Sequence, residues 1–466
     1  MSDGEWLVAF DTDRIKDYLF ATNKLKEIRG ASALLVKLNE TDTESVVRRV
    51  CPATDTVYAA GGGALFIVPS EADANRVIAA VEKLYRQETA VASITGACLA
   101  LAPATRQEGF GKRIRDLGFL LHRSKARKAQ QPVLAIAPYL HPCDACGRHP
   151  AAHRQRDEEG QDQLLCRACH IKREHTPILQ RNEPQDFGEL GGLSHPPGYL
   201  GFIHADGNLM GNRLAQLGTK ENYTDFATGV ICLLDNAARA ATSAFSLRDG
   251  KKPYIGLLLG GDDLLLTTAA DLALPAALEL AQFFEKNSSD LLKRVRLDGQ
   301  SLTLSASVVL AHADYPIAEM HRLSIKCLQR AKRRSFEAGY ATGAVDFQVV
   351  TSAVGYEDDR RPYRDRRPYT LNELAELLDY AAALQDFPTS QLQAMYESLY
   401  LSREAATLTS LLALARVRPR RRQLALRGFF QWSGSLTPNQ LPPWCEPGVT
   451  ALGDLVEVLP FVSERR

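Results

Sequence analysis

The sequence predicts an α+β protein with two ferredoxin-like domains, a zinc-binding segment between them and a helical region after them. Three observations predict this fold. The order strand, helix, two strands, helix, strand occurs twice along the chain. An apolar hairpin in the second copy turns at Gly260-Gly-Asp-Asp263, and two Cys-x-x-Cys pairs stand between the copies.

Length and composition set the broad class. A chain of 466 residues has material for about two to four domains, and its 45% hydrophobic and 24% charged residues are ordinary for a soluble globular protein. The net charge is +1, so any surface for nucleic acid must be local. No apolar run approaches the roughly 18 residues needed to cross a membrane, and the acidic start is unlike a signal peptide. We therefore expect a cytoplasmic protein.

Hydrophobic periodicity predicts the elements of the first copy. A buried strand at residues 6–10 leads to Asp11 and Asp13. The elements expected after it are helices at 15–20 and 24–35, a hairpin with a glycine-rich turn at 57–68, a helix at 72–89, a strand at 93–102 and a basic helix ending at 128.

The second copy repeats this order from residue 201. A strand at 201–206 ends in Asp206, and the elements expected after it are a helix at 222–244, the hairpin at 254–268, a helix at 272–286, a strand at 301–310 and a helix at 317–334. In each copy about 50 residues separate the strand-end aspartate from the turn, which sets Gly61 opposite Gly260 and Ser124 opposite Lys332. This duplication predicts two domains with the architecture of polymerase palms and nucleotide cyclases.

The two copies differ at the turn. The first has Gly61-Gly-Gly-Ala64 where the second has Asp262 and Asp263. Without carboxylates at its turn, the first copy is predicted to be a degenerate palm that supplies a nucleotide pocket or a dimer-like face.

Asp206, Asp262 and Asp263 are the predicted catalytic residues and the ligands of two Mg²⁺ or Mn²⁺ ions. Carboxylate oxygens suit these hard cations, and neighbouring like charges are costly unless a cation separates them. One ion would activate a 3′-hydroxyl, and both would stabilise charge on an α-phosphate and the leaving pyrophosphate. The alternative is a solvated acidic turn, which the matching position of Asp206 disfavours.

Further residues around the turn are candidates for nucleotide binding. Glycines let a ligand approach the backbone, and the carbonyl of Gly207 is a potential further metal ligand. Lys332 could contact phosphates, although the helix dipole favours a basic residue near a helix end in any case. The residues predicted to bind nucleotide are Gly207, Asn208, Gly260, Gly261, Ser307 and Lys332.

The cysteine spacing predicts a structural Zn²⁺ site. Cys143, Cys146, Cys166 and Cys169 form two Cys-x-x-Cys pairs separated by a loop, the pattern of a closed four-thiolate site. Nearby histidines, which could replace a cysteine but are expected to be bystanders, are His149, His153 and His170. The segment between the copies could brace one palm against the other.

The predicted domains are a first palm at 1–138, a zinc-binding insertion at 139–197, a second palm at 198–356, a charged linker at 357–369 and a C-terminal helical domain with a tail at 370–466. In the last of these, helical periodicity covers residues 370–400 and 403–416. The basic cluster from Arg416 to Arg422, beside aromatic residues at 429–432, fits RNA binding and, equally well, a solvated helix end or a protein-docking face.

Taken together, these motifs resemble the large polymerase-like subunit of type III CRISPR effector complexes, the cyclic oligoadenylate synthase family. The motifs that carry the resemblance are Asp11-Thr-Asp-Arg-Ile-Lys-Asp-Tyr-Leu-Phe20, Ile28-Arg-Gly-Ala-Ser-Ala-Leu34, the two cysteine pairs, Ala205-Asp-Gly-Asn-Leu-Met-Gly211 and Gly260-Gly-Asp-Asp263.

The resemblance implies that two ATP molecules bind between the palms and that the three aspartates hold the metals for 3′–5′ linkage and cyclisation. It also implies partner subunits with guide and target RNA, the latter switching synthesis on. Two features depart from the family. No His-Asp dipeptide of the nuclease domain occurs, so we expect no cleavage of single-stranded DNA, and Asn208 stands where a second acid is usual.

The sequence therefore predicts a metal-dependent nucleotidyltransferase that makes a cyclic oligonucleotide, from ATP, by in-line attack of a 3′-hydroxyl. One alternative is a stand-alone cyclase of the same family that needs no guide complex. The other is a scaffold subunit whose palms bind nucleotide without turnover.

Overall fold

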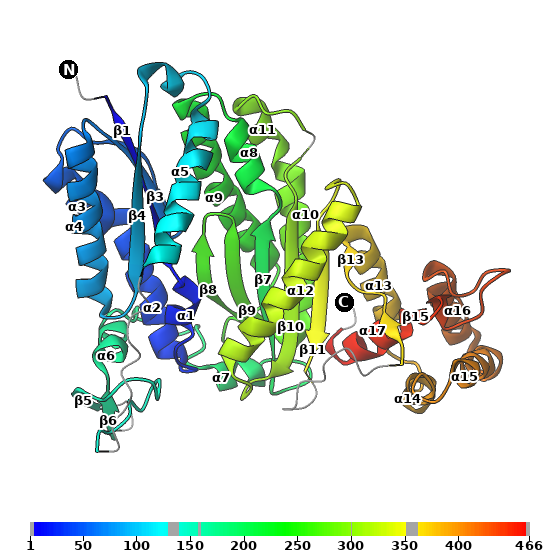
Figure 1. Cartoon of the computed structure of the whole chain (residues 1–466). Coiled ribbons are helices and arrows are strands. Elements are labelled where there is room, and N and C mark those ends of the chain that lie inside the picture. Colours follow the sequence, from blue (N-terminus) through cyan, green and yellow to red (C-terminus); the bar gives the residue numbers. More distant parts are fainter. Residues whose placement is uncertain (1–3, 129–138, 157–159, 300, 351–361, 463–466) are drawn as a thin grey trace.

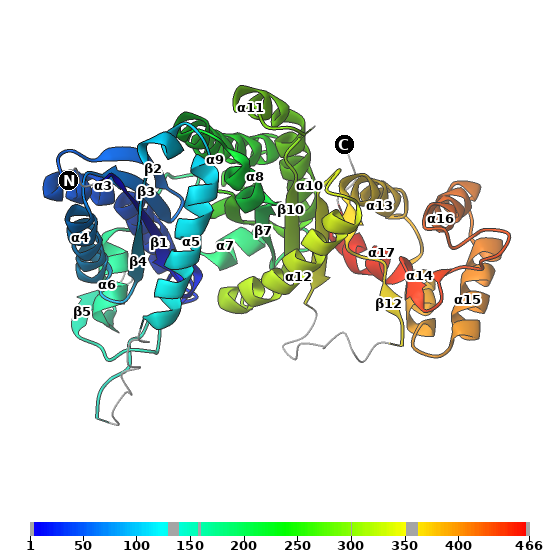
Figure 2. The ribbon, with the colours of Figure 1, turned by 45° about the horizontal axis from the view of Figure 1, so that its top comes forward.

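The computed structural model describes residues 4–128, 139–156, 160–299, 301–350 and 362–462. Two α/β domains lie side by side, and a helical region extends from the second one (Figures 1 and 2). The predicted fold class, with two palm domains, a cysteine cluster and a helical C-terminal region, is confirmed.

The first palm is a four-stranded sheet in the order β2-β3-β1-β4. Its central strand β1 is antiparallel to both neighbours, and Leu7 and Val8 on its two faces are fully buried, as alternating side chains of a strand covered on both sides must be. β1 is longer than predicted and includes both Asp11 and Asp13. The strands are β1 (Trp6–Asp13), β2 (Asp55–Ala60), β3 (Gly63–Val68) and β4 (Ser93–Ala100).

Two long helices cover this sheet, and shorter ones connect it (Figure 1). α4 begins at an N-cap, Ser70, whose side chain accepts the N–H of Asp73. The helical elements of the first palm are α1 (Ile15–Leu19), α2 (Leu25–Lys37), a π-helical turn (Leu38–Asp42), α3 (Thr43–Val50), α4 (Glu71–Thr89), a 3₁₀ turn (Pro103–Arg106) and α5 (Phe110–Arg127).

The second palm is a six-stranded sheet in the order β13-β11-β10-β7-β9-β8. Four of its strands, in the order β8-β9-β7-β10, repeat the first palm, with β7 between β9 and β10 as β1 lies between β3 and β4. The sequence did not predict β11 and β13, which extend one edge. The strands are β7 (Tyr199–Gly207), β8 (Tyr254–Gly260), β9 (Asp263–Ala269), β10 (Leu304–His312), β11 (Ala344–Val349) and β13 (Tyr369–Thr370).

Helices α9, α10 and α12 provide most of the packing of the second sheet. α10 is buried along much of its length, which matches its Ala- and Leu-rich sequence, whereas α12 has one buried and one exposed face. The helices of this domain are α7 (Phe187–Gly192), α8 (Met210–Gln216), α9 (Lys220–Ser243), α10 (Ala270–Asn287), α11 (Ser289–Arg294) and α12 (Ile317–Glu337).

Helix α5 joins the two palms. The N–H groups of Phe110 and Gly111 donate to the carbonyls of Gly218 and Leu217, beyond the end of α8. A Cβ at Gly111 would come within 2.0 Å of the carbonyl oxygen of Leu214, so only glycine permits this approach.

The cysteine segment docks on the first palm. It consists of the hairpin β5 (His153–Arg156) and β6 (Asp162–Leu165), followed by α6 (Arg167–Glu174). α6 packs on α2, where a Cβ at Gly30 would overlap the carbonyl of Lys172, and Arg173 forms a buried ion pair with Glu27. The segment thus has its close packing partner in α2; a bracing role between the palms stays a prediction.

The C-terminal region is helical, with small strands not predicted from the sequence. The helical pattern expected over residues 370–400 forms two helices, separated by a turn that contains Pro388. The elements are α13 (Leu371–Ala383), α14 (Thr389–Ser398), α15 (Arg403–Arg416), α16 (Arg420–Trp432), α17 (Leu452–Val458), a 3₁₀ turn (Leu459–Phe461), and strands β12 (Arg364–Asp365), β14 (Trp444–Glu446) and β15 (Val449–Thr450).

Part of the predicted linker at 357–369 is packed structure. Residues 357–361 lie outside the described residues, but β12 pairs with β15 and β13 adds to the second palm's sheet. The guanidinium of Arg367 is buried among the carboxylates of Asp365, Asp454 and Glu457, so this charged stretch anchors the C-terminal region.

Membrane-spanning helices were not predicted. Of the helices in the described ranges, none combines the length and the apolar character that crossing a bilayer requires.

Candidate active site between the palms

The strand-end aspartate of the second palm lies beside the hairpin turn. Asp206 at the end of β7 is paired in register with Asp263, the first residue of β9. The N–H of Gly207 donates to the carbonyl of Asp262 at 3.1 Å, which fixes the turn against the strand end. The sheet therefore brings together residues some 50 positions apart, as the repeat predicted.

The carboxyl groups of Asp206 and Asp262 are close enough to interact. Burial, and after it the negative charge of Asp206, raises the pKa of Asp262 to about 7, against the lowering effect of Lys332. Two carboxylates this close repel one another when both are ionised. A cation between them would remove that cost, so this pair has the chemistry of a divalent metal site.

Asp263 is held by different partners. Its carboxylate lies 2.8 Å from Nζ of Lys16 in α1 and 3.1 Å from Nε2 of His204 in β7. Burial alone would raise the pKa of Asp263, but the hydrogen bond to His204 and the charge of Lys16 hold that pKa below its ordinary value. Asp263 is therefore already neutralised by a cation, and that cation comes from the first palm.

Two histidines lie behind this ion pair. His204 is buried, and its Nδ1 is 3.1 Å from the hydroxyl of Ser324 in α12. His321 lies next to His204, with ring centroids 5.6 Å apart. Burial is the main cause that lowers the pKa of His321 to about 3, and the nearby His204 and Lys16 lower it as well. His321 is thus neutral at physiological pH and can act in a hydrogen bond without adding charge.

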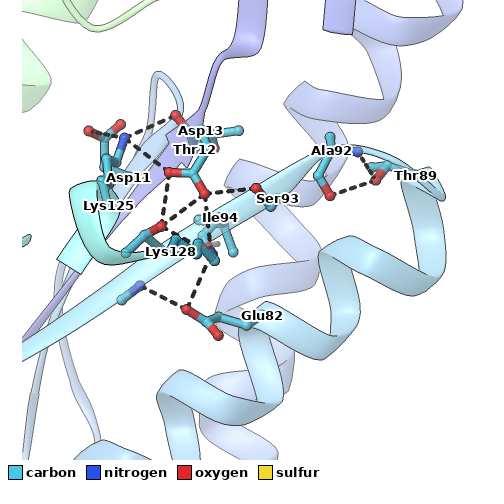
Figure 3. Close-up of polar contacts among 12 residues, drawn as sticks. Asp11, Thr12, Asp13, Glu82, Thr89, Ala92, Ser93, Ile94, Lys125 and Lys128 are labelled. Carbon is cyan, nitrogen blue, oxygen red and sulfur yellow. Dashed lines mark hydrogen bonds and ion pairs between the residues drawn. The ribbon is translucent and has the colours of Figure 1, made fainter. Parts of the chain in front are cut away.

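The lysine at the end of the last helix holds the strand-end aspartate in both palms. In the second palm, Nζ of Lys332 is 2.8 Å from Asp206 and 3.3 Å from the carbonyl oxygen of Gly207. In the first palm, Nζ of Lys125 is 2.7 Å from Asp11 and 3.3 Å from the carbonyl oxygen of Thr12 (Figure 3). Lys125, and not Ser124, therefore occupies the place of Lys332.

The residue two positions after each strand-end aspartate fills a matching structural place. Asp13 accepts hydrogen bonds from Ser93 and Thr95 of β4 and pairs with Lys128 (Figure 3). Burial would raise the pKa of Asp13, but these three partners together lower it.

Asn208 occupies that place in the second palm. Its side chain is buried, donates to Thr303 and Ser335, and accepts from Ser305. An amide can both donate and accept here, which explains how the asparagine replaces an acid without an unpaired charge. Ser307 is also fully buried and donates to the carbonyl of His204.

Two cavities flank the Gly-Gly-Asp-Asp turn. The first, of about 420 Å³, lies between α1, α2 and the second palm's turn, and is lined by Lys16, His321 and both hairpin aspartates among others. The second, of about 330 Å³, lies between α5, α9 and the turns, and is lined by Asp11, Tyr58, Tyr223 and Asp262 among others. Asp262 is thus common to both.

Some predicted nucleotide-binding residues line these cavities and others do not. Gly260 and Gly261 line the first cavity, and Gly261 also lines the second. The residues that line neither are Asp206, Gly207, Asn208, Ser307 and Lys332. Asp206 interacts with Asp262, which lines both cavities.

The two hairpin turns touch. A Cβ at Gly61 would come within 2.3 Å of the backbone nitrogen of Gly261, and one at Gly260 within 2.8 Å of the Cα of Gly61. In register, Ala60 pairs with Gly63 as Gly260 pairs with Asp263, so Gly61 is equivalent to Gly261, one residue later than the sequence spacing suggested. The first palm's glycine turn therefore completes both cavities.

The four cysteines fit zinc. Across the residues that the structure describes, they are the one set of three or more potential metal ligands whose donor atoms lie within 4.8 Å of one another. The sulfurs of Cys146 and Cys166 are 3.9 Å apart, close to the edge of about 3.8 Å expected for a tetrahedron of thiolates around Zn²⁺. Four protein ligands would leave no open position, so a zinc ion bound there would have a structural role. The three aspartates do not form such a set in the described part of the chain, although Asp206 and Asp262 interact with one another.

A ferredoxin-like sheet with one acid at a strand end and others at the adjacent hairpin turn defines a palm domain. Residues 199–337 match the family model of the Cas10/Cmr2 second palm domain. This segment is therefore a second palm domain of the Cas10/Cmr2 kind, which confirms the resemblance seen in the motifs.

Solved structures share the fold of the whole chain. The crystal structure of Csm1 from T. onnurineus has a TM-score of 0.61 at 16% identity, covering 98% of this chain and 70% of that one. Csm1–Csm4 cassettes in complex with cA4 and with AMPPNP have TM-scores of 0.58 and 0.57, each at 16% identity and covering 99% of this chain and 70% of theirs. No curated protein matches the sequence. At such identities the likeness shows the fold.

The sequence did not single out several residues of the site. Lys16, His204 and His321 were missed because their roles arise from contact between segments far apart in the chain. Lys16 stands in the motif that starts at Asp11, and His204 lies two residues before Asp206, on the same face of β7, a spacing that could have suggested it.

Proposed function

We propose that this protein is a divalent-metal-dependent nucleotidyltransferase that joins nucleotides, from ATP, into a cyclic oligonucleotide in type III CRISPR defence. The observation that carries the proposal is the interacting pair Asp206 and Asp262, at a turn with a cavity on each side. A transferase that links two nucleotides needs two neighbouring pockets and one charged centre between them.

The residues of the second palm would hold the metal and position the phosphates. Mg²⁺ or Mn²⁺, when bound, would neutralise the reacting phosphates and favour ionisation of the attacking 3′-hydroxyl. Asp206 and Asp262 supply the carboxylates, and the ion pair with Lys332 holds the side chain of Asp206 in place. Asp263 is paired with Lys16 and His204, so it fixes the turn on the side of the first palm. To act as a third carboxylate ligand of the metal, Asp263 would have to leave Lys16.

The first palm would provide the second nucleotide's pocket. Its glycine turn lines both cavities but carries no carboxylate, and its own strand-end acid is paired with Lys125. This arrangement supports one catalytic centre with two substrate pockets.

The comparisons support the choice of ligand. A Csm1–Csm4 cassette with this fold holds cA4, and another holds the ATP analogue AMPPNP. We carry both over to this chain as the proposed product class and substrate, together with a Csm4-like partner subunit and guide and target RNA.

The test is product formation. The purified protein is incubated with each nucleoside triphosphate and Mn²⁺, with and without a cognate RNA complex, and products are identified by mass. We expect a cyclic oligoadenylate from ATP and none from the variant carrying Asp262→Ala and Asp263→Ala. Unchanged ATP conversion in that variant would contradict the catalytic assignment.

The same experiment separates the alternatives. Product without added RNA would favour a stand-alone cyclase. Absence of product in every activating condition, with nucleotide still bound, would favour a scaffold subunit.

A further inference from the structure

Helix α5 presents a cationic face outside the proposed active site. The helix contains six lysines and arginines and one aspartate, in a chain whose net charge is only +1. Lys112, Arg115, Arg123 and Arg127 are exposed, and Phe119 between them is 71% exposed. Their spacings of three and four residues place them along one side of the helix, over about 22 Å. We call these five residues the cationic face of α5.

The charges of this face are uncompensated. Some exposed arginines elsewhere pair with an acid one helical turn away, as Arg48 does with Glu44 and Arg239 with Asp235. No carboxylate among the described residues pairs with the four basic side chains of the cationic face. Arg113 and Lys125, on the inner sides of the same helix, are by contrast bound to Ala100 and Asp11. The outer charges are therefore available to a polyanion.

The aromatic side chain distinguishes a nucleic acid from a protein partner. The exposed residues one turn from Phe119 are Arg115, Asp116, His122 and Arg123. Phenylalanine and arginine occur in protein interfaces too, but a protein partner would have to supply several carboxylates to match the four cations, whereas a nucleic acid carries a phosphate at every nucleotide. An aromatic ring between cations suits an unpaired strand, whose bases stack while its phosphates meet the charges.

We propose that the cationic face of α5 binds single-stranded RNA, with Phe119 stacking on a base and the four basic residues contacting phosphates. Unpaired RNA is the form whose bases are free to stack on aromatic side chains and arginine planes. The proposal does not depend on the chemistry assigned to Asp206 and Asp262. The opposite side of α5 lines the second cavity through Ile114, Gly118 and Leu121, so the strand would lie one helix away from it.

The test uses the full chain and a fluorescent 20-nucleotide oligouridylate, with binding measured by anisotropy at several salt concentrations. The variant Arg115→Glu with Arg123→Glu should bind at least about tenfold more weakly and lower the slope of log K against log salt by about 1.4, because two phosphate contacts are lost. Phe119→Ala should weaken binding about tenfold with the slope unchanged, because only stacking is lost.

The control reverses the same number of charges on the other long helix of the first palm. Lys83 and Arg86 are exposed on α4, and Lys83→Glu with Arg86→Glu should leave RNA affinity within about twofold of wild type. Circular dichroism and thermal unfolding establish that each variant is folded.

Three results would overturn the proposal: wild-type protein that does not bind the RNA at low salt, a cationic-face variant that binds like the control, or tighter binding of the matching DNA than of RNA. A cationic-face variant that still binds RNA but no longer associates with a partner subunit would assign the face to a protein instead.

Discussion

The backbone of Gly61 in the first palm lies against the backbone of Gly261 in the second, so closely that a Cβ at Gly61 would be 2.3 Å from the nitrogen of Gly261. The two palms thus meet at the tips of their equivalent hairpins. Both cavities border this contact, and Asp262 follows it directly in the chain. The geometry of the proposed site therefore depends on the fit between two turns.

Gly61→Ala should disrupt this fit. Both Gly61 and Gly261 have positive φ, 66° and 62°, so alanine is strained at either position, but a Cβ at Gly261 meets nothing within 4 Å. We expect Gly61→Ala to lower the free energy of unfolding by about 2–4 kcal/mol and Gly261→Ala by about 1 kcal/mol. Denaturant unfolding measures both. Equal losses would mean that the turns do not touch in solution.

Asp262 and Asp263 should change stability with pH in opposite directions. The raised pKa of Asp262 means that its carboxyl contributes most to stability below pH 4 and that this contribution is lost as the pH rises to about 7. At pH 8, without divalent metal, Asp262→Asn should therefore be more stable than wild type, by of the order of 1–3 kcal/mol.

The pKa of Asp263 is lowered, so its contribution is present above its ordinary pKa of 3.8 and is lost as the pH falls through the folded-state value. Asp263→Asn should therefore be less stable than wild type at pH 8. Unfolding curves at pH 4.5, 6 and 8 measure both effects, and the same sign for the two variants would contradict the assignment of partners.

Lys16 and Asp263 should be energetically coupled across the palms. The ion pair is 2.8 Å long and both side chains are about a quarter exposed. A double-mutant cycle with Lys16→Met and Asp263→Asn should give a coupling energy of about 1 kcal/mol in unfolding. Additive effects of the two substitutions would show that the pair contributes nothing to the palm interface.

Lys332 should matter more to product formation than its counterpart Lys125. Each holds a strand-end aspartate, at 2.8 and 2.7 Å, but only Asp206 interacts with a hairpin carboxyl. We expect Lys332→Met to lower the rate of ATP conversion at least about tenfold, because Asp206 loses its ion pair and Asp262 loses a positive charge that favours its ionised form. Lys125→Met removes a matched ion pair from the first palm and should have a smaller effect. Equal losses would assign the first palm's acid a catalytic role.

The cysteine site should contain about one zinc ion per chain. Cys143→Ser should remove most of it, since a closed site needs all four thiolates. Chelation should lower the midpoint of thermal unfolding because the segment docks on α2, without changing which nucleotide is used. Elemental analysis and unfolding scans check this prediction, and metal-free protein with unchanged stability would remove the site.

The order of strands and helices and the spacing of motifs in the sequence predicted the fold and the aspartates of the candidate site. The repeated strand order placed Asp206 beside the hairpin turn, and cysteine spacing alone identified four ligands whose sulfurs converge. The periodicity could not fix the register of the repeat, because loops differ in length, and it set both Gly61 and Ser124 one residue away from the true equivalences.

Contacts between domains were not predictable in this way. Lys16 reaches Asp263 only because α1 of one palm packs on the turn of the other, and no period in the sequence encodes that distance. Likewise, the sequence treated Asp262 and Asp263 as one motif. Asp262 belongs to the turn and interacts with Asp206, whereas Asp263 begins β9 and is paired with Lys16 and His204.

The proposed function requires that Asp206 and Asp262 together form the divalent metal site. Titration of Mn²⁺ into the full chain at pH 8, followed by electron paramagnetic resonance of free Mn²⁺, tests it directly. We predict that wild type binds the ion, that Asp206→Asn and Asp262→Asn each weaken binding at least about tenfold, and that Asp263→Asn changes it less. Wild-type affinity in both Asp206→Asn and Asp262→Asn would contradict the claim.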